Sequence, residues 1–124
     1  MAGRFVTSNV QVDAPTTTDF LTLPLTGNVF DILPVAAVSG TNCETSFFDV
    51  KYVNVRFSSG WFEKGTVITI MLPACGGCIP CLRFLNNDYL SLVGGTHFMP
   101  TTAHTSLTLI SNGNGSWREV SRNA

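Results

Sequence analysis

The sequence contains few charged residues. Asp, Glu, Lys and Arg make up 12% of its 124 residues, about half the share found in a typical soluble domain. The 7 basic and 8 acidic residues leave a formal net charge of -1, so the chain lacks the excess of positive charge with which proteins hold nucleic acid. Apolar residues make up 44%. We therefore expect no nucleic-acid partner, and we expect much of the surface to be buried against other protein chains.

Long apolar runs are also absent. No run approaches the roughly 20 residues that a membrane-spanning helix needs. The first residues, MAGRFVTSNVQVD, lack the apolar stretch of a secretory signal. We expect no membrane partner and no export through a signal peptide.

Helical periodicity is missing as well. Gly, Pro, Thr, Ser and Asn interrupt every window before apolar residues can recur three and four positions apart. Short alternating runs are present instead: in SFFDVKYVNVRF, Val53, Val55 and Phe57 share one face of a strand. No repeat period indicates a solenoid or propeller. The pattern predicts an all-β fold with almost no helix, either a single antiparallel β-sandwich that is jelly-roll-like or a small barrel.

Two parts of the chain differ in composition. Residues 1–34 mix Thr and Pro with isolated Phe and Leu residues, as in DAPTTTDFLTLPLTG, and Pro is disfavoured inside a sheet. We expect this part to be an extended N-terminal arm that packs on a neighbouring chain. Residues 35–124 should form the β-sandwich domain, closed by a hairpin in which Leu107 and Leu109 share a face.

The cysteines carry the strongest chemical signal. Cys75, Cys78 and Cys81 are separated by two residues each in CGGCIPC, a spacing that lets thiolates converge on a tetrahedral zinc ion. Cys43 or a histidine would have to supply the fourth ligand. Without a signal peptide we expect thiols in a reducing compartment, serving as small residues at a sheet end, with disulfides as the second choice. We predict no cofactor, and zinc at these cysteines is the alternative.

No catalytic group of residues stands out. Nothing in the sequence orients the two histidines or the scattered carboxylates toward one another, so we expect no enzymatic activity. Trp61 and Phe62 stand beside Glu63 and Lys64 in a turn. They are candidates for an aromatic surface that binds a partner, and the alternative is packing over a sheet edge.

Three segments in the second half of the chain follow one another in a recognisable order: EKGTVITIMLP, LRFLNNDYLSLVGG and SLTLISNGNGSWREVSRN. A glycine opens a strand, a turn precedes a Leu-x-Leu strand, and a final hairpin ends in Gly-x-Trp-x-Glu-x-Ser-Arg. This order resembles the ends of tail-fibre, tailspike and decoration-type proteins of tailed phages and other large viruses. The matching residues are Gly65, Leu90, Leu92, Gly115, Trp117, Glu119, Ser121 and Arg122.

The resemblance implies a small β-structured module that trimerises and is displayed on a virion. We expect a non-enzymatic viral structural protein, a capsid decoration (cement) protein that forms homotrimers on the lattice of the major capsid protein. Its location would be the virion, assembled in the host cytoplasm. The alternative is a receptor- or carbohydrate-binding tip or tail module in which Trp61, Phe62, Tyr89 and His97 face a host glycan. The candidate interface residues are Trp61, Phe62, Trp117, Arg118, Glu119 and Arg122, with Arg118 or Arg122 paired to a carboxylate.

Overall fold

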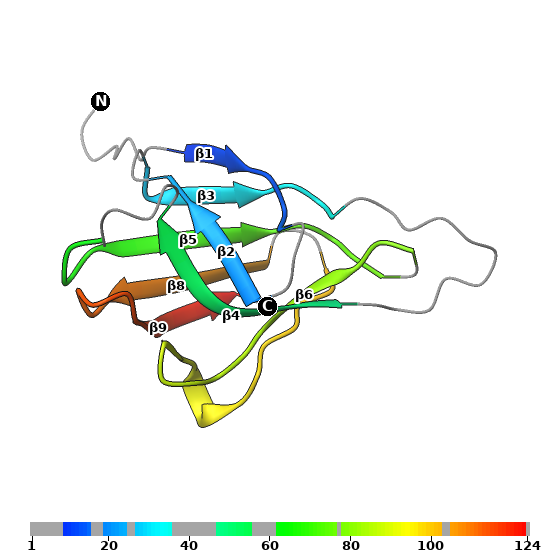
Figure 1. Ribbon diagram of the computed structural model, residues 1–124. Coiled ribbons are helices and arrows are strands. Elements are labelled where there is room, and N and C mark those ends of the chain that lie inside the picture. Colours follow the sequence, from blue (N-terminus) through cyan, green and yellow to red (C-terminus); the bar gives the residue numbers. More distant parts are fainter. Residues whose placement is uncertain are drawn as a thin grey trace.

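The computed structural model describes residues 9–15, 19–24, 27–35, 47–55, 62–76, 78–102 and 105–123. Within these residues it contains nine strands and one 3-10 turn, so the expected all-β fold with almost no helix is confirmed. No helix in this part of the chain is long and apolar enough to cross a membrane. The strands form a six-stranded sheet and a three-stranded sheet (Figure 1).

The six-stranded sheet runs in the order β1-β3-β5-β8-β9-β7. It contains β1 (Asn9–Val12), β3 (Val29–Ile32), β5 (Val67–Leu72), β8 (Thr105–Ser111), β9 (Trp117–Asn123) and β7 (Leu90–Ser91). The three-stranded sheet runs in the order β2-β4-β6 and contains β2 (Asp19–Leu23), β4 (Phe47–Val55) and β6 (Cys81–Phe84). The 3-10 turn η1 (Val93–Gly95) follows β7.

Consecutive strands from β1 to β7 belong to opposite sheets. Strands β1, β3 and β5 are therefore parallel neighbours, and so are β2, β4 and β6. Parallel neighbours need a long crossover, and here each crossover contains a strand of the other sheet. The chain thus winds as a coil around one core. The expected antiparallel pairing is found only between β5 and β8 and between β8 and β9 among the described strands, and elsewhere it is wrong.

Residues 9–32 differ from the expected extended arm. They supply β1, β2 and β3, and β3 lies between β1 and β5 inside the six-stranded sheet. Leu21, Leu23, Phe30 and Ile32 are each at most 2% exposed. The prolines of this part lie between the strands, where their missing N–H groups interrupt no ladder. Residues 1–8 lie outside the described residues.

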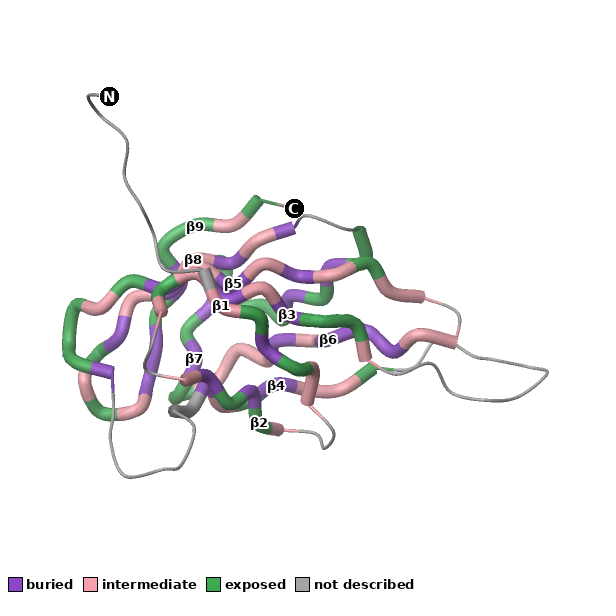
Figure 2. The backbone as a smooth tube through the Cα atoms, turned by 90° about the horizontal axis from the view of Figure 1, so that it is seen from above, coloured by how far each residue is buried: buried purple, intermediate pink, exposed green. Residues whose placement is uncertain are grey.

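The alternating strands line a core between the two sheets. In β5, Ile68, Ile70 and Leu72 are buried while the residues between them face outward. Figure 2 shows the same alternation of buried and more exposed positions along β3 and β8. Burying one such Ile or Leu side chain stabilises the fold by roughly 2 kcal/mol. A period of two therefore reports the buried face of these strands. Of the face predicted for Val53, Val55 and Phe57, Val53 is buried, whereas Phe57 and the side chain of Val55 lie outside the described residues.

The predicted closing hairpin is present as β8 and β9. Leu107 and Leu109 are both fully buried on the same face, as expected. The turn needs glycine at Gly113, whose φ is +87°. A Cβ atom there would lie 2.8 Å from Cβ of Lys64, so any larger residue would be strained and would also clash.

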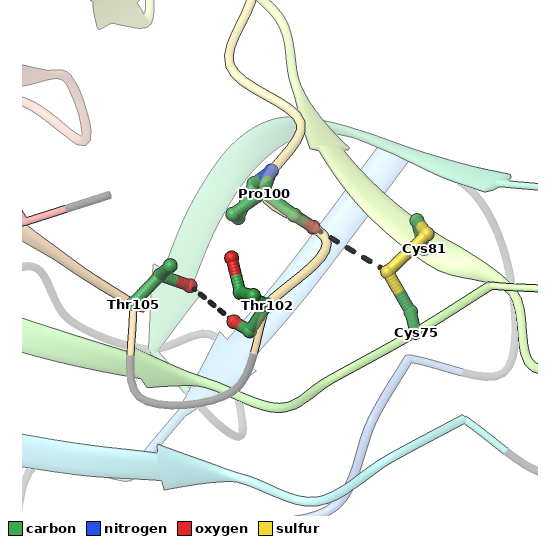
Figure 3. The surroundings of a disulfide bond; sticks show 5 residues. All are labelled: Cys75, Cys81, Pro100, Thr102 and Thr105. Atoms are coloured by element: carbon green, nitrogen blue, oxygen red, sulfur yellow. Dashed lines mark hydrogen bonds between the residues drawn. A yellow bond between two sulfur atoms is a disulfide. The ribbon is translucent and has the colours of Figure 1, made fainter.

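A disulfide links Cys75 and Cys81 (Figure 3). A tight turn in which Gly76 and Ile79 exchange backbone hydrogen bonds of 2.9 and 3.1 Å lies between them. This turn brings the two Cα atoms to 5.2 Å, within the range that a disulfide spans. The N–H of Cys75 also donates to the carbonyl oxygen of Thr101 at 3.1 Å, which fastens the loop to the segment before β8.

The expectation of free thiols is therefore wrong for the three cysteines of the loop. Cys78 is disulfide-bonded as well, and Cys43 lies outside the described residues. A sulfur atom in a disulfide is not a thiolate, so Cys75, Cys78 and Cys81 cannot act as zinc ligands in this state. The two-residue spacing was ambiguous because it suits a tight metal loop and a tight disulfide loop equally well.

We expect replacement of both Cys75 and Cys81 by Ala to lower the free energy of unfolding by about 2 kcal/mol, because the bond closes a short loop in the unfolded chain. Urea unfolding followed by tryptophan fluorescence measures the loss. Alkylation of the denatured, unreduced wild-type protein serves as the control and should label neither cysteine. Equal unfolding midpoints for the variant and the oxidised wild type would contradict this assignment.

Candidate functional site

Three aromatic rings lie together on the outer face of the three-stranded sheet. Phe20 of β2 is paired with Tyr52 of β4, and their ring centroids are 5.1 Å apart at an interplanar angle of 23°. Tyr89, in the turn before β7, meets Tyr52 edge to face with centroids 4.8 Å apart. Phe20 is 46% exposed and Tyr89 is 48% exposed. We call Phe20, Tyr52 and Tyr89 the aromatic strip.

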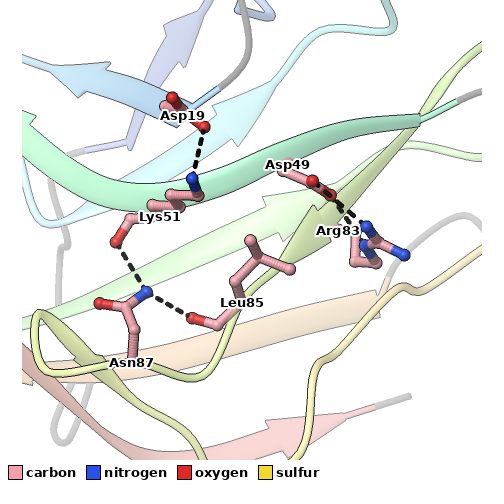
Figure 4. Close-up of polar contacts among 6 residues, drawn as sticks. All are labelled: Asp19, Asp49, Lys51, Arg83, Leu85 and Asn87. Carbon is pink, nitrogen blue, oxygen red and sulfur yellow. Dashed lines mark hydrogen bonds and ion pairs between the residues drawn. The ribbon is translucent and has the colours of Figure 1, made fainter.

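Asn87 holds Tyr89 in this position, and Figure 4 shows the contacts of Asn87 with Lys51 and Leu85. Its Nδ2 donates to the carbonyl oxygens of Lys51 at 3.2 Å and Leu85 at 2.9 Å, which attaches the turn to β4. Its Oδ1 accepts the N–H of Tyr89 at 2.7 Å. The carbonyl oxygen of Tyr89 in turn accepts the N–H of Trp117 at 2.9 Å. The backbone that carries the exposed ring is thus fixed on both sides.

An ion pair lies beside the strip. Nζ of Lys51 is 3.6 Å from Oδ1 of Asp19, and the two side chains are 46% and 38% exposed (Figure 4). Asp19 has a φ of +85°, which costs a non-glycine residue backbone strain. The register of β2 against β4 shifts between Asp19 and Phe20. The strained residue therefore precedes the step at which Phe20 comes to lie opposite Tyr52.

The other end of the same sheet face carries a second polar and aromatic group. Arg83 of β6 donates to both carboxylate oxygens of Asp49, at 2.8 and 3.2 Å. Its guanidinium carbon lies 3.9 Å from the centroid of the Phe47 ring. Phe47 is 42% exposed. The ring of Phe47 is therefore in contact with the paired cation of Arg83. The rings of the aromatic strip instead contact one another.

The conspicuous aromatic residues of the predicted interface lie in the core. Trp117 is 2% exposed and Phe62 is 7% exposed, with their ring centroids 5.2 Å apart. Nε1 of Trp117 donates to the carbonyl oxygen of Val53 at 2.9 Å. The expectation that Trp117 faces neighbouring chains is wrong, because its indole joins the two sheets of its own chain. For Phe62 the packing alternative holds. Trp61 lies outside the described residues.

The predicted pairing of an arginine with a carboxylate occurs within the chain. Nε and Nη2 of Arg122 each lie 2.6 Å from a carboxylate oxygen of Glu119, whose Oε1 also accepts the N–H of Val93 at 2.9 Å. Arg122 also lies over the ring of Phe98, 4.1 Å from its centroid. Glu119 is only 6% exposed. Both residues therefore stabilise the fold around η1. Among the described members of the predicted set, Arg118 is the exposed one.

These contacts lower the pKa of Glu119. The hydrogen bonds from Arg122 favour the carboxylate most strongly, burial opposes them, and the N–H of Val93 adds to the lowering. The same pair raises the pKa of Arg122. The charged forms are thus stabilised together inside the fold.

Other groups do not form a reactive centre in the described part of the chain. Nδ1 of His97 accepts the N–H of Asn86 at 3.0 Å, so this histidine caps a turn. No three His, Cys, Asp or Glu side chains of the described residues converge as metal ligands would. An open cleft of about 420 Å³ has only one charged residue in its wall. Its lining residues are Asp13, Ala14, Pro15, Leu33, Pro34, Val35 and Phe48.

Sequence reasoning did not single out Phe20 and Tyr52. Each side chain points outward from its strand. This outward position is the only feature of the local sequence that could have indicated them. Their proximity depends on the parallel register of β2 with β4. That register could not be predicted while residues 1–34 were assigned to an arm.

The chain matches no protein-family model, no curated protein and no solved structure. The function is therefore argued from the geometry of the chain itself.

We expect the Glu119–Arg122 pair to make stability depend on pH. Because the pKa of Glu119 is lower in the fold than its ordinary value of about 4.3, its contribution is complete above that value. The contribution is lost as the pH falls through the lowered value. Near neutral pH, Glu119→Gln should cost about 2 kcal/mol because it leaves buried hydrogen-bond donors of Arg122 poorly paired.

Urea unfolding of the wild type and of Glu119→Gln at several pH values between about 3 and 7 measures this effect. The difference between the two proteins should shrink toward the acid end. Arg118→Gln, which alters an exposed charge on the same strand, should leave the pH dependence of the wild type intact. A difference that stays constant over the whole range would show that Glu119 keeps its ordinary pKa.

Proposed function

We propose that the protein is a non-enzymatic structural subunit that assembles with copies of itself as a homotrimer, as a decoration protein on a viral capsid would. The outer face of the six-stranded sheet is the observation that carries this proposal. The C-terminal resemblance to virion proteins supports the viral setting, and the major capsid protein is the partner we propose beyond self-association. The proposed location is the virion.

Three rows of side chains cross this outer face. One row pairs Val67 with Ile110, and the next pairs Thr69 with Thr108, whose hydroxyl oxygens are 3.1 Å apart. The third pairs Met71 with Ser106. The rows continue onto β3 and β9 through the remaining members, which are Val29, Asp31, Arg118, Ser121 and Asn123.

The composition of the face favours burial against protein. Among the residues of these three rows, only Asp31 and Arg118 carry charge, and they stand on different strands. Val67 is 46% exposed, and Val120, which lies on β9 where its register against β8 shifts, is 54% exposed. A sheet face with methionine and few charges suits an interface core, from which charged residues are depleted. A solvated sheet face would be expected to carry more charge.

The arrangement of the sheets supports a sandwich rather than a barrel. The two sheets are separate, with edges at β1 and β7 in one and at β2 and β6 in the other, and they share a core. The mainly parallel pairing supports a wound coil more than a jelly roll, whose strands run antiparallel. Residues 9–32 belong to the sandwich in this proposal. We therefore do not propose them as an arm that attaches the protein to the capsid.

The alternative function is a receptor- or carbohydrate-binding module. The aromatic strip is the observation that favours it, because the strip lies on the opposite sheet from the proposed trimer interface. Both roles can therefore exist in one protein.

We expect Thr108→Lys to break the oligomer without unfolding the chain. Thr108 lies in the middle row of the outer face, where lysines from several copies would be brought together and deprived of water. The dissociation constant should rise about 100-fold or more. Light scattering over a range of protein concentrations measures this change.

Thr22→Lys is the matched control, because Thr22 is an exposed strand residue on the outer face of the three-stranded sheet. It should leave the oligomer intact. A wild-type protein that remains monomeric at high concentration would contradict the proposal. The proposal would also be contradicted if Thr22→Lys dissociated the trimer while Thr108→Lys left it intact. Cosedimentation with capsids that lack the protein then tests the decoration role.

A further inference from the structure

The proposed assembly leaves the aromatic strip open, and the inference about its ligand rests on the alternative carbohydrate-binding function proposed above. We propose that Phe20, Tyr52 and Tyr89 bind the pyranose rings of a neutral carbohydrate. The inference is independent of the oligomeric state, because the strip and the outer face of the six-stranded sheet belong to different sheets.

The rings offer the surface that a sugar needs. The C–H groups on one side of a pyranose carry partial positive charge, and the faces of aromatic rings carry partial negative charge. Tyr52 lies between the other two rings. Phe20 and Tyr89 each keep about half of their surface open. Stacking on Tyr52 covers one face of Phe20. A sugar would therefore contact the other face of Phe20, at the edge strand β2, and the exposed part of Tyr89.

The size of the strip fits a small ligand better than a protein. Two rings that are each about half exposed, together with the partly buried ring of Tyr52, present roughly 250 Å² of surface. A stable protein interface buries about 800 Å² on each partner. Extending the strip to that area would bury the Lys51–Asp19 ion pair. Charged residues are depleted from the core of protein interfaces, so a second protein is the less favoured occupant.

The polar groups beside the rings match sugar hydroxyls. Lys51 supplies a donor, Asp19 supplies an acceptor, and both side chains are partly exposed. The hydroxyls of Tyr52 and Tyr89 can donate and accept. Because Lys51 and Asp19 pair with each other, this ion pair adds no net charge that would select an anionic or cationic ligand. A neutral sugar, whose hydroxyls both donate and accept, is the ligand class that this set favours.

The strip is also held in place before any ligand arrives. Asn87 and Trp117 fix the backbone of Tyr89 through the hydrogen bonds at 2.7 and 2.9 Å. The pairing of β2 with β4 fixes Phe20 against Tyr52. Little freedom is therefore lost on binding, which raises affinity. Asn87 is a positioning residue, since its side chain acts on the ligand only through Tyr89.

The test uses the full-length protein and a panel of neutral oligosaccharides, namely cellotetraose, maltotetraose, chitotetraose and mannotetraose. Saturation-transfer NMR detects binding, and titration of the tyrosine ring signals gives the affinity. We expect at least one member of the panel to shift the signals of Tyr52 and Tyr89. Tyr89→Ala should then weaken binding about tenfold. Asn87→Ala should weaken it while the ring of Tyr89 is still present, and Tyr89→Phe should retain most of the affinity.

Phe47→Ala is the matched control, because Phe47 is an exposed aromatic residue at the other end of the same sheet face. It should leave the affinity unchanged. Thr108→Lys should bind the sugar even where it no longer forms oligomers, which separates this inference from the proposed assembly. The inference is overturned if no member of the panel shifts the tyrosine signals, or if Phe47→Ala weakens binding as much as Tyr89→Ala. It is also overturned if the strip becomes protected on oligomerisation alone. Retention of the folded NMR spectrum by each variant excludes unfolding as the cause.

Discussion

The hydrogen bond from the indole of Trp117 to the carbonyl oxygen of Val53 joins the two sheets at 2.9 Å. Trp117 belongs to the antiparallel hairpin that ends the described chain, and Val53 belongs to the parallel strand β4. The ring of Trp117 also packs on Phe62, and its backbone fixes Tyr89. A coil that changes sheet at each strand has no local hairpins to hold it closed until β8 and β9. The hairpin of β8 and β9 therefore closes the coil. Its residue Trp117 also holds the backbone of Tyr89 in the aromatic strip.

Winding the chain between two sheets produces two outer faces with different chemistry. The six-stranded sheet presents rows of Thr, Val, Ile, Met and Ser with few charges. The three-stranded sheet presents aromatic rings next to the ion pairs Lys51–Asp19 and Arg83–Asp49. The first face suits contact with copies of the chain, and the second suits a small polar ligand. The scarcity of charged residues in the sequence is thus most evident on the outer face of the six-stranded sheet.

Local patterns predicted the elements whose structure is local. The sequence pattern predicted the strands β5 and β8, the shared face of Leu107 and Leu109 in β8, and the closing turn at NGNG. Strands β1 to β3 were missed because short strands between prolines resemble an extended segment. Parallel pairing was missed because it joins strands that are not adjacent in the chain and that are unevenly spaced, so no repeat is visible. The burial of Trp117 and the register of Phe20 with Tyr52 depend on the same long-range winding.

The central claim is that one outer face is buried in the assembly while the other stays open. Hydroxyl-radical footprinting read by mass spectrometry tests it directly, at protein concentrations below and above the onset of association. The account predicts that Met71 and Ile110 lose reactivity as the protein assembles, while Phe20 and Tyr89 keep theirs. Loss of reactivity at Phe20 and Tyr89 with no change at Met71 and Ile110 would contradict it, because the rings would then form the interface between copies.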